Sequence, residues 1–445
     1  MNKRNYGLLT AIAMIVGVVI GSGIFFKSDN VLGYTGGNVL AGVLVFCVAA
    51  LAIVFGCLSF SQLALLSDKP GGIITYSQEF ASQRFACAFG WFDTFLYYPT
   101  LTVVVSWVAG IYACMLFGFE QTLNNQVLIG LLFTVLLFVM NVLSAKLGGI
   151  FQSAALIIKL VPLIGIAIIG LAFGQPGEAI AAHAGAVGPA SLFAAIVPIA
   201  FAFDGWICAT SICHEIRDSR KNLPRAMIFS PLIILVVYVA YFVGISALVG
   251  PDKVMQLGDA HVEYAATNLF GAVGAKVILV FVLISVLGTV NGLILGGIRM
   301  PYSLALRGMV PGSATIAKEN EKVGGMPVAS AVLFFVVTMF WYLVHYLTSA
   351  FNLLPGSDIS EIAIVVHYLL FAGLYFTVIR LTAQGRIKNK FYGYVSPVLA
   401  TLGSVIILIG GFQSKLFPLY LAINAVVVLL SLAYYARHKN EIHAI

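Results

Sequence analysis

Two short stretches decide the fold of this chain: GVVIGSGIF at residues 17–25 and FAFDGW at residues 201–206. Each interrupts a hydrophobic segment near its middle. In a bilayer an unpaired backbone N–H or C=O group costs several kcal/mol, so unwound backbone persists there only where protein, water or a ligand satisfies it. The two breaks are therefore the candidate ligand site.

The composition predicts an all-α membrane protein. Of the 445 residues 61% are hydrophobic and 9% charged, and the mean hydropathy is +1.02, which excludes an ordinary soluble domain. Apolar runs of about 20 residues predict twelve membrane spans with short loops and no soluble domain. The expected spans are 7–33, 37–66, 83–116, 125–144, 148–174, 190–213, 225–249, 272–301, 327–347, 358–380, 391–412 and 416–436.

The positions of the two breaks indicate an internal duplication. One lies in the first span and the other in the sixth, which is the first span of a second set of five. Interrupted segments at matching positions of two halves are typical of inverted-repeat transporters with a site at the midplane. We expect a first repeat over 1–174, a second, inverted repeat over 190–380 and accessory helices within 391–436.

Basic residues predict the orientation. With a cytoplasmic N-terminus, the cytoplasmic side collects all of the 24 Lys and Arg residues except Lys27, Lys159, Lys253, Lys276 and Lys415. Both termini are then cytoplasmic by the positive-inside rule, and the net charge of +7 reflects topology rather than nucleic-acid binding. An alternative is a cleavable signal peptide ending near residues 21–23, which would leave eleven spans and invert the charge asymmetry.

The first break can bind a zwitterion. A helix that stops at Val19 and Ile20 leaves unpaired C=O groups, and a restarting helix presents free N–H groups at a positive dipole end. A carboxylate would bind the N–H groups of Ser22, Gly23 and Ile24, while an ammonium would bind the C=O groups. A GSG triplet alone is more typical of close helix packing. Its pairing with the second break favours a ligand site.

The second break adds carbonyl groups and a carboxylate. The C=O groups freed here, including that of Ala202, are further acceptors for the ammonium. Asp204 is either a functional intramembrane charge or an N-cap, accepting from the N–H of Ile207, for a helix that restarts at Gly205. We favour the cap, with the Asp204 carbonyl still available. Phe201 is expected to cover the ligand as a gate, the alternative being a core aromatic.

Lys159 is the other charge predicted to lie at depth. It follows Gly148 by 11 residues, or about 16 Å along a helix, too far for its side chain to reach water. The ammonium would occupy the place of a transported cation such as Na⁺, or would carry a proton. Ser285 and Thr289, one turn apart, are possible partners.

Metal, cofactor and enzyme chemistry are not indicated. The six cysteines lie within or at the ends of spans, which predicts no disulfide framework, and the histidines show no metal-ligand spacing. His345 and His367 are expected to be satisfied core histidines. Ser22 lacks a nearby base, so we do not expect an enzyme. The sequence contains neither a continuous polar pore nor symmetric filter loops, so we do not expect a channel.

Three motifs carry a family resemblance: GVVIGSGIF, FAFDGWICATSICHEIRDSRKNLPRAM at 201–227 and GTVNGLILGGIRMPYSLALRGMVP at 288–311. They resemble the amino acid, polyamine and organocation superfamily, and more narrowly a bacterial member of its L-type amino acid transporter branch, similar to serine/threonine and alanine/serine/cysteine exchangers. The resemblance implies the twelve-helix LeuT-type fold and sodium-independent obligatory exchange of α-amino acids. It assigns the carboxylate to Ser22 and Gly23, the amine to the carbonyls of Val19, Phe201 and Asp204, the gate to Phe201, and the vacated cation site to Lys159.

Two departures from animal relatives bear on partners and selectivity. Those relatives carry a Cys in the loop between spans three and four that binds an ancillary glycoprotein. Residues 118–125, GFEQTLNN, contain none, so a standalone subunit is expected. Several animal members have glycine at the position of Asp204.

The expected activity is antiport of neutral L-amino acids, small ones such as Ala, Ser, Thr and Cys, across the plasma membrane, the inner membrane of a bacterium. The spans offer few carboxylates that could bind a cationic side chain, which favours neutral substrates. A proton-coupled symporter of the same fold is the alternative, and it would use titration of Lys159 or Asp204.

Overall fold

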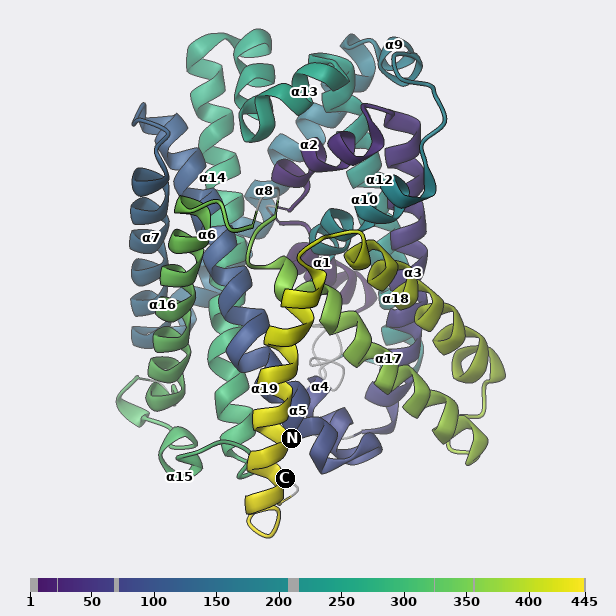
Figure 1. Cartoon of the computed structure of the whole chain (residues 1–445), viewed down its shortest axis with the longest axis vertical. Coiled ribbons are helices and arrows are strands. Elements are labelled where there is room, and N and C mark those ends of the chain that lie inside the picture. Colours follow the sequence, from purple (N-terminus) through teal and green to yellow (C-terminus); the bar gives the residue numbers. More distant parts are fainter. Residues whose placement is uncertain are drawn as a thin grey trace. The chain divides into compact units, whose positions relative to one another are not determined.

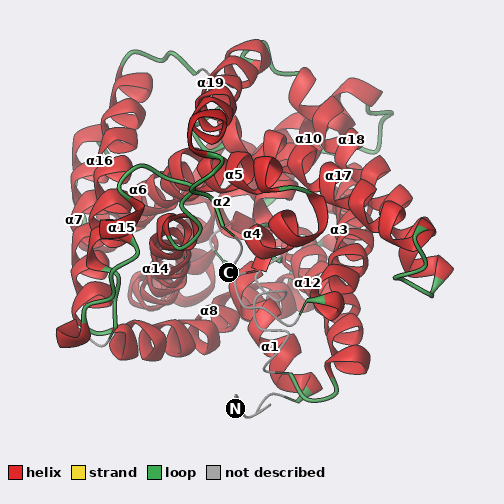
Figure 2. Cartoon of the chain, turned by 90° about the horizontal axis from the view of Figure 1, so that it is seen from below, coloured by secondary structure: helices red, strands yellow, loops and turns green. Residues whose placement is uncertain are grey.

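The computed structural model of the chain describes residues 7–21, 23–67, 72–206, 216–323, 325–354 and 357–443. Within these ranges helices joined by short loops make up the fold (Figure 2), and the β-structure is one isolated bridge between Asn320 and Met326. Ten helical stretches of the described chain are long and apolar enough to cross a membrane, and Leu8–Gly17 and Pro189–Ala202 are shorter apolar helices. The all-α membrane fold is confirmed, while the count of twelve spans stays a prediction.

The chain divides into two compact units, and Figure 1 labels many of their helices. Unit 1 comprises Met1–Asp68, Leu156–Ser285 and Phe371–Lys415, and it contains both sequence breaks. Its complete helices are α1 (Leu8–Val19), α2 (Gly23–Thr35), α3 (Val39–Leu66), α9 (Pro176–Ala181), α10 (Pro189–Ala202), α12 (Ser219–Val249), α13 (Pro251–Leu257), the 3-10 helix η4 (Gly258–Ala260), the π-helix η6 (Phe391–Val395) and α18 (Ser396–Phe412).

Unit 2 comprises Lys69–Ala155, Val286–Leu370 and Leu416–Ile445. Three helices contribute a part to each unit: α8 (Ala145–Phe173), α14 (His261–Ala305) and α17 (Glu361–Ala383). Each unit thus combines segments of both predicted repeats, and the repeats themselves stay a prediction. The complete helices of unit 2 are α4 (Gly72–Tyr76), α5 (Gln83–Phe92), α6 (Tyr98–Phe117), α7 (Leu123–Leu143), α15 (Ser313–Ile316), α16 (Val328–Ala350), α19 (Phe417–His438), the π-helices η1 (Ser77–Ala81) and η2 (Asp93–Tyr97), and the 3-10 helix η5 (Glu321–Val323).

Helix α7 shows why these helices suit a membrane. One of its faces is buried within unit 2 and includes the small or polar residues Gly130, Thr134 and Asn141, whereas the opposite face exposes large apolar side chains at a spacing of three or four residues. A continuous apolar stripe of this kind is stable against lipid rather than water. The exposed residues are Leu128, Leu132, Leu136, Val139 and Leu143.

Several helix boundaries follow from local sequence. The side chain of Asn38 accepts a hydrogen bond from the N–H of Ala41 and caps α3, and Gly118 ends α6 with a left-handed φ of 71°. Within α14, Gly271 has a φ of 69°, which no helical residue adopts. The expected span 272–301 is therefore preceded by a separate helical segment that the sequence pattern did not indicate.

In unit 1 the helices that carry the breaks have different main neighbours, although α12 contacts both α1 and α2. Helix α1 packs on α12, whereas α2 packs on α10 and α13, and α10 also packs on α3 and α18. An aromatic cluster fills the space beside the second break, where the ring of Phe46 contacts those of Phe203, Tyr238 and Phe242. The fold thus brings the two breaks into one core.

Candidate functional site

The first break separates α1 from α2 close to the predicted boundaries. Helix α1 ends at Val19, and Ile20 leaves it with extended backbone while its N–H still bonds to the carbonyl of Val16 at 2.8 Å. Helix α2 begins at Gly23. Val19, Ile20, Gly23 and Ile24 are all buried, and Ser22 lies outside the described residues. A C-terminal and an N-terminal helix end therefore face the interior of unit 1.

The second break begins where α10 ends, at Ala202. The N–H groups of Phe203 and Asp204 bond back to the carbonyls of Ile199 and Phe201, at 3.0 and 3.1 Å, so residues 203–206 form a turn. Gly205 has a left-handed φ of 93°. The predicted helix restart at Gly205 is therefore wrong, because a residue in that region of backbone space cannot begin a right-handed helix. The proposed cap of Asp204 on Ile207 lies outside the described residues.

The two breaks touch at Gly23. A Cβ built on Gly23 would lie 2.7 Å from Cα of Ala202 and 3.4 Å from Cδ1 of Phe201. Because the first distance is far below an ordinary contact, only glycine lets α2 begin this close to the end of α10. The start of one half-helix is thus set directly against the end of another.

Tyr238, on α12, links the two helix ends. Its hydroxyl lies 2.8 Å from the carbonyl oxygen of Ala202 and 3.1 Å from that of Val19, and its single hydrogen is shared between these two acceptors. The side chain is fully buried. The sequence did not single out this residue, because nothing in the pattern of residues distinguishes it from an ordinary core tyrosine of an apolar helix. The carbonyl ends of α1 and α10 therefore converge on one point.

Lys159 is buried as predicted, with 1% of its surface exposed. Its Nζ donates a hydrogen bond to the carbonyl of Gly17, in the last turns of α1. The ammonium therefore lies beside the first break. Ser285 is fully buried in unit 1 and Thr289 belongs to unit 2. Their pairing with Lys159 stays a prediction.

Phe201 lies at the same junction and is 8% exposed. The ammonium of Lys27, on α2, lies 5.1 Å from the centroid of its ring, in the geometry of a cation–π contact. Lys27 is itself 5% exposed, although its position one turn after Gly23 did not single it out. Phe201, the expected gate residue, thus lies at the end of α10 and packs against α2.

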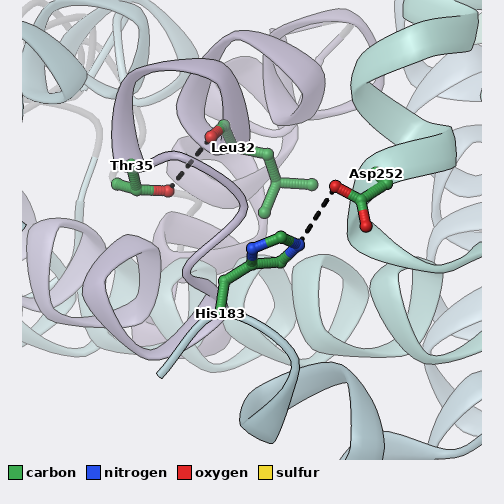
Figure 3. Close-up of polar contacts among 4 residues, drawn as sticks. All are labelled: Leu32, Thr35, His183 and Asp252. Atoms are coloured by element: carbon green, nitrogen blue, oxygen red, sulfur yellow. Dashed lines mark hydrogen bonds and ion pairs between the residues drawn. The ribbon is translucent and has the colours of Figure 1, made fainter. Parts of the chain in front are cut away.

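A hollow of about 610 Å³ in unit 1 lies away from the two breaks. It lies between the end of α2 and the loop 182–188 that follows α9. Figure 3 shows His183 of this loop 3.0 Å from Asp252 of α13, beside the Thr35 hydroxyl that bonds to the Leu32 carbonyl. Asn38 ties the same loop to α3 through the Gly185 carbonyl at 2.9 Å. These contacts fasten the loop over the end of α2.

Metal and disulfide chemistry is not seen in the described part of the chain. No three His, Cys, Asp or Glu side chains gather there as ligands, and the four cysteines it contains are free thiols. His345 and His367 are buried in unit 2, as expected of core residues. His367 Nε2 lies 3.6 Å from Asp93 Oδ1, while neither ring nitrogen of His345 has a hydrogen-bond partner among the described residues, contrary to the expectation.

An all-helical membrane chain in which helix ends of opposite polarity meet in one core has the design of a multi-pass transporter. A model of the amino acid permease family matches residues 6–433. The chain belongs to this family, whose members are transporters of amino acids and not enzymes.

Known relatives agree with this assignment. The serine/threonine exchanger SteT of Bacillus subtilis (strain 168) is 27% identical over 413 residues, which cover 91% of this chain and 90% of SteT. The human b(0,+)-type amino acid transporter 1 is 26% identical and covers 96% of this chain and 86% of its own length. The human cystine/glutamate transporter is also 26% identical, over 83% of this chain and 74% of its own. The predicted superfamily and branch are confirmed.

The fold has a solved counterpart. The crystal structure of MhsT in complex with L-phenylalanine matches with a TM-score of 0.62 at 14% sequence identity, covering 91% of this chain and 98% of MhsT. The LeuT-type fold inferred from the sequence is thereby confirmed.

Proposed function

We propose that this protein is a sodium-independent antiporter that exchanges neutral L-amino acids, foremost small ones such as Ala, Ser, Thr and Cys, across the plasma membrane by alternating access. One observation carries the proposal: α2 begins against the end of α10, while the carbonyl ends of α1 and α10 converge on the Tyr238 hydroxyl. N–H groups at the start of one helix, set beside C=O groups at the ends of two others, are complementary to a carboxylate and an ammonium.

We propose that the α-carboxylate binds at the start of α2 and that the α-ammonium binds at the carbonyl ends of α1 and α10. Each carbonyl has two lone pairs, so an ammonium can bind beside the Tyr238 hydroxyl or replace it. Phe201 covers the bound ligand, which its contacts with both Gly23 and Lys27 support. The proposed donors are the N–H groups of Ser22, Gly23 and Ile24, and the proposed acceptors are the carbonyls of Val19, Ile20, Phe201, Ala202 and Asp204.

Sodium independence is proposed because Lys159 supplies a fixed positive charge beside the first break. Its ammonium bonds to the Gly17 carbonyl, a group of the kind that would otherwise coordinate a cation. Ser285 and Thr289 remain the proposed further partners of this ammonium. A bound Na⁺ next to it would meet like-charge repulsion in a medium of low dielectric constant.

The exchange mode and the cellular setting follow from sequence and kinship. SteT is named as a serine/threonine exchanger, and it aligns with nearly the whole chain. The distribution of Lys and Arg supports cytoplasmic termini, in a bacterial inner membrane. The loop 118–125 lacks the cysteine that would link an ancillary subunit, so the protein is proposed to act without one.

A proton-coupled symporter is the second candidate, favoured by the burial of Lys159, since a buried lysine readily exchanges its proton. Reconstitution in liposomes with labelled amino acids separates the two. An exchanger takes up label only when amino acid is present inside, regardless of Na⁺ and of a pH gradient. Uptake into empty liposomes driven by a pH gradient would establish the symporter, and sodium-driven uptake would refute the role of Lys159.

A further inference from the structure

Three polar side chains of unit 1 lie outside the two breaks and are linked electrostatically. They are Asp29 on α2, which is half-buried, and the buried Tyr241 on α12 and His261, the first residue of α14; the Asp29 charge acts on each of the other two. Tyr241 and His261 are completely buried. Asp29 Oδ1, Tyr241 Oη and His261 Nε2 are buried atoms without a hydrogen-bond partner among the described residues. Such atoms are rare in folded proteins and indicate a ligand or a proton that the site holds.

The hydrogen positions on His261 follow from its contact with η4. Its Nδ1 lies 2.6 Å from the carbonyl oxygen of Gly258, which can only accept, so Nδ1 carries the hydrogen. In a neutral ring Nε2 is then an acceptor. The carboxylate of Asp29 lies over the same glycine, since a Cβ built on Gly258 would be 3.8 Å from Asp29 Oδ2. Two buried acceptors therefore belong to one small region.

We propose that Asp29 and His261 form a site that binds one proton when α2 packs against η4 and the start of α14. The proton comes from water and binds either to Nε2, giving an imidazolium in the same region as a carboxylate, or to Oδ1, giving a neutral acid in the same region as a neutral imidazole. Both forms convert two acceptors into a donor and an acceptor. Both also replace a buried net charge of −1 by a neutral pair, which a low-dielectric interior favours.

Further groups surround the pair. The Lys27 ammonium on α2 stabilises the ionised Asp29 carboxylate and so favours Nε2 of His261 as the place of the proton, and Tyr241, on α12, lies near the Asp29 charge. The backbone carbonyl of Gly258 fixes the tautomer from η4. The pair and the groups around it thus lie on four elements, α2, α12, η4 and the start of α14, that are packed together where it forms. Proton binding is thereby linked to the packing of α2.

Proton binding at this pair affects α2, the helix whose first residue lies at the candidate substrate site. Asp29 follows Gly23 by six residues, about 9 Å along α2. Above the ordinary histidine pKa of about 6.5 neither group of the unpacked arrangement holds the proton. The packed arrangement then holds one proton more, so its population falls as the pH rises through this range, by at most about tenfold per pH unit. The proposal does not depend on which substrate is carried or on the exchange mode.

The test is thermal unfolding of the purified protein in detergent, without substrate, across the range from mildly acidic to mildly alkaline pH. We expect the Tm of the wild type to fall as the pH rises above about 6.5, and Asp29→Asn and His261→Gln to flatten this slope. His183→Gln is the matched control: His183 also faces a carboxylate, but in an exposed pair, which contributes little. This variant should keep the wild-type slope.

Identical slopes for wild type, Asp29→Asn and His261→Gln would overturn the proposal and indicate a bound water molecule instead. Should one of these two variants fail to fold, the other carries the comparison. If both fail, the pH dependence of amino acid binding to the wild type decides: a flat profile refutes the site. These measurements do not depend on exchange in liposomes. The proposed antiport and the proposed proton site can therefore be refuted independently of each other.

Discussion

Replacing Gly23 by alanine tests the contact on which the candidate site rests. The added methyl would lie 2.7 Å from Cα of Ala202 and 3.2 Å from its Cβ, whereas ordinary contacts begin at 3.4 Å. Helix α2 must therefore move away from α10 by about 0.7 Å, the difference between 3.4 and 2.7 Å. Overpacking of this kind costs about 1–3 kcal/mol. A displacement approaching 1 Å at a binding site lowers rates by up to about 100-fold.

We expect Gly23→Ala to lower kcat/KM of amino acid exchange in liposomes by at least about tenfold, with a lower Tm in detergent. Gly33→Ala is the matched control, because it adds the same methyl to the same helix where nothing lies within 4 Å. Alanine is also the better helix former, so this variant should exchange normally with an equal or higher Tm. The reasoning is refuted if Gly23→Ala exchanges as well as Gly33→Ala.

Three further substitutions probe the same junction. Tyr238→Phe keeps the ring on its aromatic neighbours but removes the donor shared by two buried carbonyls. It should reduce the free energy of unfolding, measured by denaturant titration, by about 1–3 kcal/mol. A variant as stable as the wild type would show that the hydroxyl does not stabilise the junction. Lys159→Ala should reduce the turnover number more than it lowers Tm, and unchanged transport would remove Lys159 from the mechanism. Phe201→Ala should raise the apparent KM through poorer occlusion of the ligand, whereas a wild-type KM and exchange rate would count against a gate.

The breaks could be predicted because their residues are conspicuous in an apolar chain. Glycines at 21 and 23 and the carboxylate of Asp204 stand out against long apolar runs, and the observed ends of α1 and α2 agree with the expected ones. Burial of Lys159 followed from its distance along the helix from the nearest loop. Each of these inferences needed only local sequence and the cost of polar groups in lipid.

The contacts between elements could not be predicted in the same way. Tyr238 and Lys27 matter because of how α12 and α2 approach α10, and no periodicity along one helix encodes that approach. The wrong restart at Gly205 has a local cause, since a cap was expected where glycine instead takes a left-handed turn conformation. Long-range packing, rather than helix content, is what a single sequence leaves undetermined here.

The different main neighbours of α1 and α2 have a mechanical consequence. Helix α1 is held to α12 and to the ammonium of Lys159, while α2 packs mainly on α10 and α13. Ile20, the first residue after α1, has extended backbone, and its N–H bonds back into α1 rather than forward into α2. We therefore expect α1 and α2 to tilt separately, each with its main neighbours, which is the motion that the proposed alternating access requires.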